Sequence, residues 1–587
     1  MKKFILKVAA LSIAFVIAIV TACNKSYFEV DPIGQLANNQ VTTQKGAEQI
    51  LIGAYAALNS GNWNGSFTNW IYGSACGGDA NKGSNAGDQS QMNEIIRFEG
   101  QPVNFDFNLK WVAIYNGVAR ANQAIIVTNN LKPDQIPDAD RRRIIAEARF
   151  LRGFYHFEGK KVFNMVPYID ENVSYSAGNF RVPNDRDIWP NIEADLKFAY
   201  DNLPEVQRQP GRANKWAAAA FLGKALLFQR KFAEAKRYFD ECIERGRTAK
   251  GERYGLMEEF SQNFNADFDN NKESIFAFQA SVNDGTGAAN ANPDQVLNFP
   301  HNNGWSGPMP AGCCGFHQPS FDLANSFRTT PQGLPLLDGS YNLPQNELKH
   351  DMGIPSDRPF TPDEGPLDPR IDWTIGRRGI PYLDWGPHPG NAWIRDVNNG
   401  GPFSPKKNVF YRAQQGRLTD NSSWTPGYTA LNYHFMRYAD LLLMAAECEV
   451  ELGNLERARQ LVNQVRRRAA NPAGFVRFPD GRPAANYRIS EYTTPWTNQE
   501  FARNAVRFER RLELAMEGHR FFDLVRWGIA DQVLNAYLQY ESTKLAFFRG
   551  ARFTKGKNEY FPIPQVQIDI TGNGPDGRPI LRQNPGY

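Results

Sequence analysis

The sequence predicts an all-α dominated fold, in which a tetratricopeptide-like body of about four helix pairs carries a large loop-rich insertion. Two observations support this prediction. Small and large apolar residues recur at helical spacing in separate segments of the chain. Between these segments, residues 280–430 hold 19 of the 37 prolines and 18 of the 49 glycines. Hydrophobic residues make up 42% of the 587 and charged residues 22%, so the chain can bury a large core, which excludes a disordered protein.

The first well-defined helix pair is expected from Trp216 to Arg245. Small and large apolar residues occupy two helical faces there, and the turn falls at Arg230. The same offsets recur from Tyr438 to Ala469. Small residues let two helices approach, and large residues fill the groove between them. Because such units bury their faces only by stacking, we expect one domain over residues 23–587, with helical repeats at about 107–163, 190–245, 436–470 and 499–540.

The loop-rich insertion spans about residues 280–430, and a smaller segment of similar composition spans about 59–100. Proline fixes φ and removes a backbone donor, so its density forbids long helices and makes regular sheet interiors unfavourable. The larger segment also holds five tryptophans, at 305, 373, 385, 393 and 424. Loops carried on a rigid frame are where binding usually resides. We therefore expect the ligand site on these two segments.

Residues 1–22 have the pattern of a signal peptide. Three lysines lie within the first seven residues, and the uncharged run Val8–Val20 is too short to cross a bilayer. The sequence Val20-Thr21-Ala22-Cys23 looks like the lipobox of a bacterial lipoprotein, which predicts acylation of Cys23 and a lipid anchor on a membrane. The alternative is an ordinary signal peptide followed by an incidental cysteine.

Charge and motifs argue against nucleic-acid binding and against catalysis. A net charge of +4 is too small for the electrostatic surface of a nucleic-acid binder. The chain has no HExxH, GxSxG, GxGxxG or Walker motif, and its seven histidines are scattered. We expect no enzyme, no catalytic residue, no cofactor and no metal site, although a structural calcium ion stays open.

The charged run from Glu509 to Arg526 has two interpretations. Glu513 and Glu517 lie one helical turn apart, as a pair of catalytic carboxylates could. Acids and arginines three or four residues apart more often neutralise each other, and arginine forks can join one helix to the next. We favour this structural interpretation, and we extend it to four further charged residues: Arg149, Arg152, Arg437 and Asp440.

Five cysteines follow Cys23, and an odd number excludes a fully paired set in an exported chain. Cys242 and Cys448 lie in helical patterns and are expected in the core. Cys313 and Cys314 are adjacent and flanked by glycines. They could form a disulfide with each other, one of them could pair with Cys76, or both could remain thiols.

The positive signal for function is aromatic, with Trp, Tyr and Phe at 13% of the chain. A sugar presents an apolar face of C–H groups edged by hydroxyls, so its receptor needs flat rings and polar side chains beside them. Trp70 and Trp305 are the leading candidates, and Trp385 and Trp393 are second choices. The other expected ligand contacts are Trp63, Asn69, Tyr72, Asp79, Asn303, Phe316 and His317. For any single loop tryptophan, packing onto the helices is the more frequent role.

Five motifs in order resemble the SusD/RagB family of outer-membrane lipoproteins of Bacteroidetes. They cover most of the chain after residue 22 and comprise Cys23–Pro32, Glu147–Tyr155, Arg437–Glu447, Glu509–Leu514 with Glu517–Trp527, and Gln583–Tyr587. The acidic run often found after the lipidated cysteine in this family is weak here, because Asn24-Lys25-Ser26 intervenes.

The resemblance implies a non-catalytic protein anchored through Cys23 and exposed on the surface of the outer membrane. Members of this family cap a SusC-like TonB-dependent transporter, capture glycan fragments and deliver them as a hinged lid. The expected partners are therefore an oligosaccharide, such a transporter and the outer membrane. A peptide-uptake protein of the same family and a helical-repeat scaffold that binds only protein remain as alternatives. The sequence does not identify the glycan.

Overall fold

The computed structural model describes residues 1, 42–60, 63–292 and 298–587. Residues 2–22 of the expected signal peptide and the expected lipidation site, Cys23, lie outside the described residues. The described chain consists mainly of helices and loops, and its strands form short two-stranded pairs. The predicted helical class with paired helices and loop-rich regions is confirmed. No helix among the described residues is both long and apolar enough to cross a membrane.

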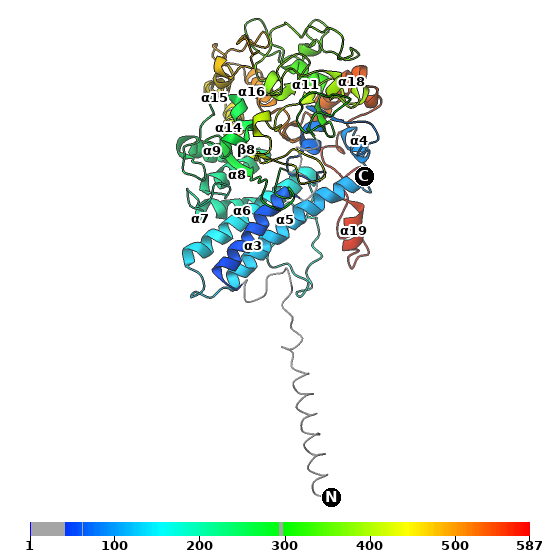
Figure 1. Ribbon diagram of the computed structural model, residues 1–587. Coiled ribbons are helices and arrows are strands. Elements are labelled where there is room, and N and C mark those ends of the chain that lie inside the picture. Colours follow the sequence, from blue (N-terminus) through cyan, green and yellow to red (C-terminus); the bar gives the residue numbers. More distant parts are fainter. Residues whose placement is uncertain (2–41, 61–62, 293–297) are drawn as a thin grey trace.

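Three helices lie side by side at one end of the body (Figure 1). They are α3 (Gln44–Ala56), α5 (Phe105–Asn130) and α6 (Asp138–Phe163). Side chains at the starts of two of these helices accept hydrogen bonds from free backbone N–H groups. Thr43 Oγ1 accepts from Gly46 N, and Asn104 Oδ1 accepts from Asp106 N, both in the first turn.

The next three helices extend the array in sequence order: α7 (Trp189–Asn202), α8 (Lys215–Phe228) and α9 (Phe232–Arg245). Gly223 has the role that the small-large spacing predicts for a small residue, which is to let two helices approach closely. A Cβ atom at Gly223 of α8 would lie 2.6 Å from the Phe239 ring of α9, so only glycine allows this close packing.

Helix α9 then packs against the C-terminal helices. α14 (Tyr438–Glu451) contacts α9, α15 (Leu455–Ala469) and α16 (Gln499–Leu514). The helical repeat expected at about 499–540 begins with α16, which packs on α14 and α15. The later helix α18 (Ala530–Lys544) instead packs on α17 (Arg520–Arg526) and α11 (Phe321–Ser326). Left-handed φ values at Met516 and Gly518, 67° and 77°, end α16 and redirect the chain.

Strand pairs connect segments that are far apart in sequence. β1 (Ala80–Gly83) pairs antiparallel with β3 (Phe316–Pro319), and β2 (Ser274–Phe278) pairs antiparallel with β8 (Tyr433–Arg437). Thus the first pair joins the two loop-rich segments, and the second joins the middle of the chain to α14. Two smaller pairs lie within the insertion: β4 (Ile375–Gly376) with β5 (Ser404–Pro405), and β6 (Thr419–Asp420) with β7 (Tyr428–Thr429).

Short helices complete the described fold. The α-helices are α4 (Gln91–Ile96), α12 (Ile371–Thr374), α13 (Val397–Gly400) and α19 (Gln565–Thr571), and η3 (Trp70–Ala75) is a π-helix. The 3-10 helices are η2 (Ala57–Asn59), η4 (Phe260–Phe264), η5 (Ala266–Phe268), η6 (Ser340–Asn342), η7 (Asn391–Trp393), η8 (Arg412–Gln414), η9 (Pro472–Gly474) and η10 (Ala546–Phe548).

Buried ion pairs link the C-terminal helices to the insertion. Arg437 Nη1 lies 2.8 Å from Glu273 Oε1 and 2.6 Å from Glu513 Oε1, and its Nε lies 2.8 Å from Glu517 Oε2. Glu509 pairs in the same way with Arg370 and Arg466, at 2.7 and 2.8 Å. The structural interpretation of the charged run is therefore confirmed, because Glu513 and Glu517 both form ion pairs with Arg437.

The four further charged residues also form ion pairs. Asp195 of α7 lies 2.8 Å from Arg149 Nε and 2.7 Å from Arg152 Nη2, so these arginines join α6 to α7. Asp440 lies 3.2 Å from Lys224 Nζ and 2.8 Å from Arg510 Nη1.

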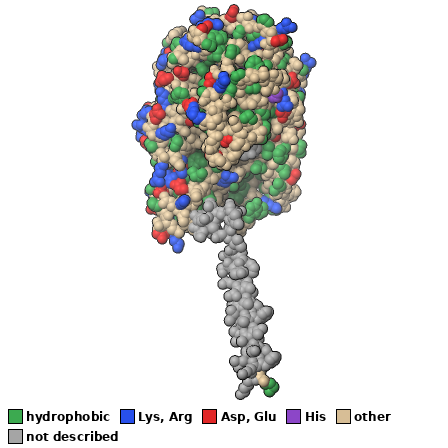
Figure 2. Space-filling view, in the orientation of Figure 1, with side chains coloured by type: hydrophobic (Ala, Val, Ile, Leu, Met, Phe, Trp, Pro, Cys, Tyr) green, Lys and Arg blue, Asp and Glu red, His purple; other side chains and the backbone are tan. Residues whose placement is uncertain are grey.

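On the surface, Figure 2 shows acidic and basic side chains interspersed over one face of the molecule, in keeping with the small net charge.

Candidate functional site

Eight of the expected ligand contacts lie in the core, each with 7% or less of its surface exposed. They are Asn69, Trp70, Tyr72, Asp79, Phe316, His317, Trp385 and Trp393. The pairing of β1 with β3 brings the two loop-rich segments together beside Asp79, Phe316 and His317. The structure therefore does not offer these side chains to a ligand.

Trp70 illustrates the correction. It is the first residue of η3, and its indole ring is 3% exposed. The rings of Phe316 and His317 lie 6.0 and 5.6 Å from it, centroid to centroid. A sugar could stack on Trp70 only after displacing these rings. Burial also lowers the pKa of His317 to about 3, so this imidazole is neutral at physiological pH.

The buried polar candidates bond within the protein. Asn69 donates to Glu158 Oε2 and accepts from Lys110 Nζ, at 3.0 and 2.9 Å. The Tyr72 hydroxyl donates to the Asp106 carbonyl at 3.0 Å. Asp79 Oδ2 accepts from Met516 N at 3.2 Å, and burial raises the pKa of this carboxyl to about 6. These contacts support the loop and do not face solvent.

The two second-choice tryptophans are also structural. Trp385 donates from Nε1 to the Phe410 carbonyl at 3.0 Å and packs edge-on against the Phe410 ring. Trp393 is 1% exposed and lies among Tyr382, His388 and Trp305. Both therefore belong to the packed base of the insertion.

We call three accessible tryptophans of the loop-rich segments the aromatic surface: Trp63, Trp305 and Trp424. Trp424 is 59% exposed, and Trp63 and Trp305 are half-buried. The rings of Trp63 and Trp424 lie 5.8 Å apart, with 56° between their planes. Asn303, the remaining candidate, is exposed beside Trp305 in the sequence. Of the expected contacts, the structure thus leaves Trp63, Asn303 and Trp305 available to a ligand.

Trp424 was not among the candidates that the sequence indicated. It stands in the run Asn421-Ser422-Ser423-Trp424-Thr425-Pro426-Gly427, which consists largely of turn-forming residues around one large ring. That composition is the signal that could have identified it. Its neighbour Trp63 lies more than 300 positions earlier, so sequence spacing does not predict the pair.

Hydrogen bonds and close packing connect the loops near the aromatic surface. Asn59 Nδ2 donates to the Ala289 carbonyl at 3.0 Å, and Asn292 N donates to the Thr429 carbonyl at 3.1 Å. Gly427 is packed so closely that a Cβ atom there would lie 2.6 Å from Ala311 Cβ. The loop of Trp305 therefore adjoins the loop of Trp424.

Trp305 rests on the buried part of the insertion. Its ring lies 6.4 Å from the Trp393 ring at 90°, and its Nε1 donates to the Pro308 carbonyl at 3.2 Å. Asn303 N donates to the Ala392 carbonyl at 3.0 Å, which fixes the chain just before the ring. A ring supported on one edge and half-exposed can stack against a ligand.

A cleft of about 610 Å³ lies beside α3 and the start of the loop-rich insertion. Asn59, Ser60, Ala289 and Asn290 line part of it, and Asn59 Nδ2 donates to the Ala289 carbonyl. Arg120 of α5 and residues 209–212 also line it. The amides that line this cleft can bond hydroxyl groups, and the aromatic surface can cover apolar faces.

The adjacent cysteines form a disulfide, one of the three alternatives left open by the sequence. Cys76, Cys242 and Cys448 are free and buried, so the last two lie in the core as expected.

Within the described part of the chain, no group of three or more His, Cys, Asp or Glu side chains could hold a metal ion.

Comparisons with known proteins match both halves of the chain. A model described as "SusD family" matches residues 272–587, and a model described as "Starch-binding associating with outer membrane" matches residues 26–227. SusD-like protein P2 of Formosa agariphila is 23% identical over 599 aligned residues, which cover 98% of this chain and 99% of that protein.

Solved structures share the fold. A SusD superfamily protein from Bacteroides vulgatus is 21% identical with a TM-score of 0.66, covering 93% of this chain and 100% of the other. Surface glycan-binding protein A from Bacteroides thetaiotaomicron, in complex with laminarihexaose, is 19% identical with a TM-score of 0.63, covering 92% and 99%. The "SusD family" model matches more than half of this chain. The chain therefore belongs to the SusD family.

Proposed function

We propose that this protein binds oligosaccharides on the aromatic surface and delivers them to a SusC-like TonB-dependent transporter of the outer membrane. The observation that carries the proposal is the exposed ring of Trp424 beside Trp63, on loops that a rigid helical body supports. Adjacent exposed aromatic rings form an apolar patch, and such patches on soluble proteins often mark a binding site. A sugar ring provides a face of suitable size and edges that bond nearby amides.

The geometry of the rings favours a bent ligand. Since the planes of Trp63 and Trp424 differ by 56°, one flat chain cannot lie against both rings at once. A glycan that turns between successive units can place one apolar face on each ring. Because the related surface glycan-binding protein was solved with laminarihexaose, that oligosaccharide is the first probe to use.

The test is isothermal titration of the protein with laminarihexaose, maltohexaose and cellohexaose. We expect a dissociation constant of roughly micromolar to millimolar for at least one of them, in keeping with later release. Trp424→Ala and Trp63→Ala should each weaken binding about tenfold or more, because each removes one stacking face.

Tyr175→Ala is a matched control, since Tyr175 is 83% exposed on a loop outside the aromatic surface. Its affinity should equal that of the unchanged protein. Equal losses in all three variants would contradict a site at Trp63 and Trp424. Binding of peptides with no binding of any glycan would favour the alternative of a peptide-uptake protein.

Delivery and anchoring form the second half of the proposal. They rest on the lipobox-like sequence before Cys23 and on the family to which the chain belongs. Membrane extracts of cells that produce the Cys23→Ala protein should contain much less of it than extracts with the unchanged protein. Co-purification of the anchored protein without any transporter would favour a protein-binding scaffold instead.

A further inference from the structure

We propose that the disulfide between Cys313 and Cys314 positions the Trp305 loop for ligand binding, so that reducing it weakens glycan affinity. This inference rests on the proposed function, because it concerns one ring of the aromatic surface. The disulfide belongs to the same chain segment as Trp305, eight positions after it.

The disulfide comes directly after the neck of the Trp305 loop, which is the point where residues 302 and 312 meet. Asn302 N donates to the Gly312 carbonyl at 3.3 Å, which closes residues 302–312 into one loop with Trp305 inside it. The backbone at this neck is left-handed, with φ of 53° at Ala311, 87° at Gly312 and 110° at Cys314. Residues other than glycine seldom adopt such conformations, so something must hold Ala311 and Cys314 in them.

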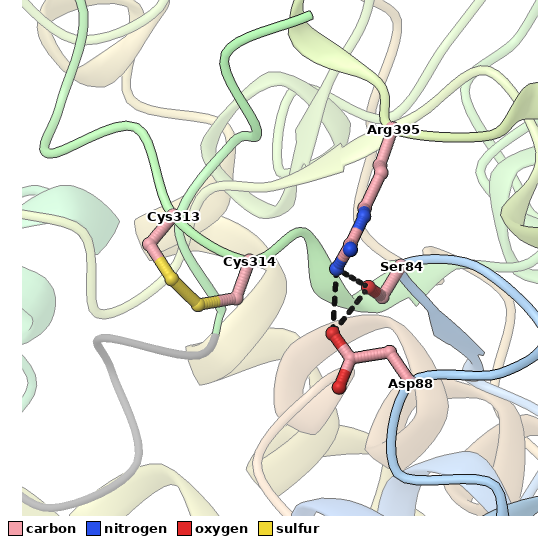
Figure 3. Close-up of a disulfide and its surroundings, with 5 residues drawn as sticks. All are labelled: Ser84, Asp88, Cys313, Cys314 and Arg395. Carbon is pink, nitrogen blue, oxygen red and sulfur yellow. Dashed lines mark hydrogen bonds and ion pairs between the residues drawn. A yellow bond between two sulfur atoms is a disulfide. The ribbon is translucent and has the colours of Figure 1, made fainter.

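The segment after the disulfide is fixed to the body. Gly315 N donates to the Phe299 carbonyl at 3.0 Å, and the Gly315 carbonyl accepts from Ser84 N at 2.6 Å. Figure 3 shows Arg395 reaching toward Ser84 and Asp88 beside the segment that carries the disulfide. Arg395 Nη1 donates to Ser84 Oγ at 2.8 Å and also pairs with Asp88. The disulfide therefore lies between a fixed segment and the loop that carries Trp305.

A bond between adjacent cysteines acts locally. The stability that a disulfide adds through chain entropy grows with the length of the loop it closes, and here the residues are neighbours. The bond instead closes a small ring that contains one peptide unit, and this ring restricts the backbone torsions of both cysteines. Its removal should change the neck of the loop and leave global stability nearly unchanged.

The effect extends to the other rings through Ala311. This residue precedes Gly312 and packs against Gly427, in the loop of Trp424. If the neck relaxes, the Trp305 loop loses its fixed position against the loop of Trp424. A ligand that spans both rings then binds a mixture of loop conformations, which lowers its apparent affinity.

The experiment compares the unchanged protein with C313S/C314S. We expect laminarihexaose, or whichever glycan the unchanged protein binds, to bind the variant about tenfold more weakly. The midpoint of thermal unfolding should shift by no more than about 2 °C, as expected for a loop of minimal length. Unchanged affinity would overturn the inference, and so would a large loss of thermal stability that accounts for the weaker binding.

Reduction provides a matched test on the unchanged sequence. Dithiothreitol breaks the S–S bond, donating two electrons and two protons to form two thiols, and is itself oxidised to a cyclic disulfide. Affinity should fall to that of C313S/C314S, and the variant itself should not respond to the reagent. The buried thiols of Cys76, Cys242 and Cys448 are already reduced and should not contribute.

A measurement without ligand separates this inference from the proposed function. Hydrogen exchange of the backbone in residues 302–312 should become about fivefold faster in C313S/C314S, while α5 and α6 stay unchanged. Faster exchange in a protein that binds no glycan would leave the positioning role intact and reject only the proposed function. Equal exchange rates would overturn the positioning role whatever the protein binds.

Discussion

At the residue scale, the loop tryptophans Trp70 and Trp424 differ in exposure to solvent. Both stand among glycine, asparagine, serine or threonine, and both lie on segments without long helices. Trp70 is 3% exposed and Trp424 is 59% exposed. The difference comes from residues 316 and 317, which cover Trp70 and are far from it in the sequence. The residues next to Trp70 in the sequence do not indicate that Phe316 and His317 pack against its ring.

The buried position of Trp70 predicts a structural effect. Trp70→Ala removes a ring packed against Phe316 and His317, and the resulting cavity should cost about 3–5 kcal/mol of unfolding free energy. Urea denaturation followed by circular dichroism measures this loss. Trp424→Ala, measured in the same way, should change stability by less than about 1 kcal/mol. Equal stability of the two variants would contradict the assignment of Trp70 to the core.

At the element scale, helix pairs follow from the sequence because their signal is local. Gly223 lies opposite Phe239 in the contact of α8 with α9, as the small-large spacing predicts. The partner of α16 depends on the course of the chain that follows it. The chain turns at Met516 and Gly518, and α16 packs on α14 and α15.

Two helical glycines make a matched pair of substitutions. Gly223→Ala should destabilise the protein by about 1–3 kcal/mol, because the new Cβ would lie 2.6 Å from the Phe239 ring. Gly53→Ala in α3 should stabilise it by about 0.5–1 kcal/mol, because nothing lies within 4 Å of the new Cβ and alanine favours helix. Thermal and urea unfolding of both variants check the opposite signs.

At the scale of the whole molecule, the buried ion pairs around Arg437 join helices from the C-terminal half to the middle of the chain. Removing one partner from such a cluster leaves charges buried without compensation. Arg437→Met should therefore destabilise the protein by about 3–5 kcal/mol. The exposed pair of Arg467 and Glu491 supplies the control, and Arg467→Met should cost roughly 0–1 kcal/mol.

The same cluster predicts sensitivity to acid. Burial alone would raise the pKa of Glu517, but Arg437 and Lys407 lower it to about 2, from an ordinary value of 4.5. A lowered pKa in the folded state stabilises the protein above the ordinary value, and this contribution disappears as pH falls from about 4.5 to about 2. Unfolding free energy should decrease over this interval, and Glu517→Gln should show a smaller decrease. Identical slopes for both proteins would contradict the role of Glu517.

Membership of the SusD family makes the chain a binding protein and not an enzyme, as the absence of catalytic motifs in the sequence predicts. The extent of the single domain, the lipid anchor at Cys23 and the identity of the glycan remain predictions or open choices.

The sequence by itself determined the helical class, the positions of most helix pairs, the loop-rich insertion and the structural role of the charged run. These depend on spacing within one or two turns of a helix, or on local proline and glycine content. Only the tertiary structure decided which rings face solvent, which cysteines pair and where α16 packs. Each of these depends on contacts between residues distant in sequence, as Trp63 with Trp424 and Trp70 with Phe316 show.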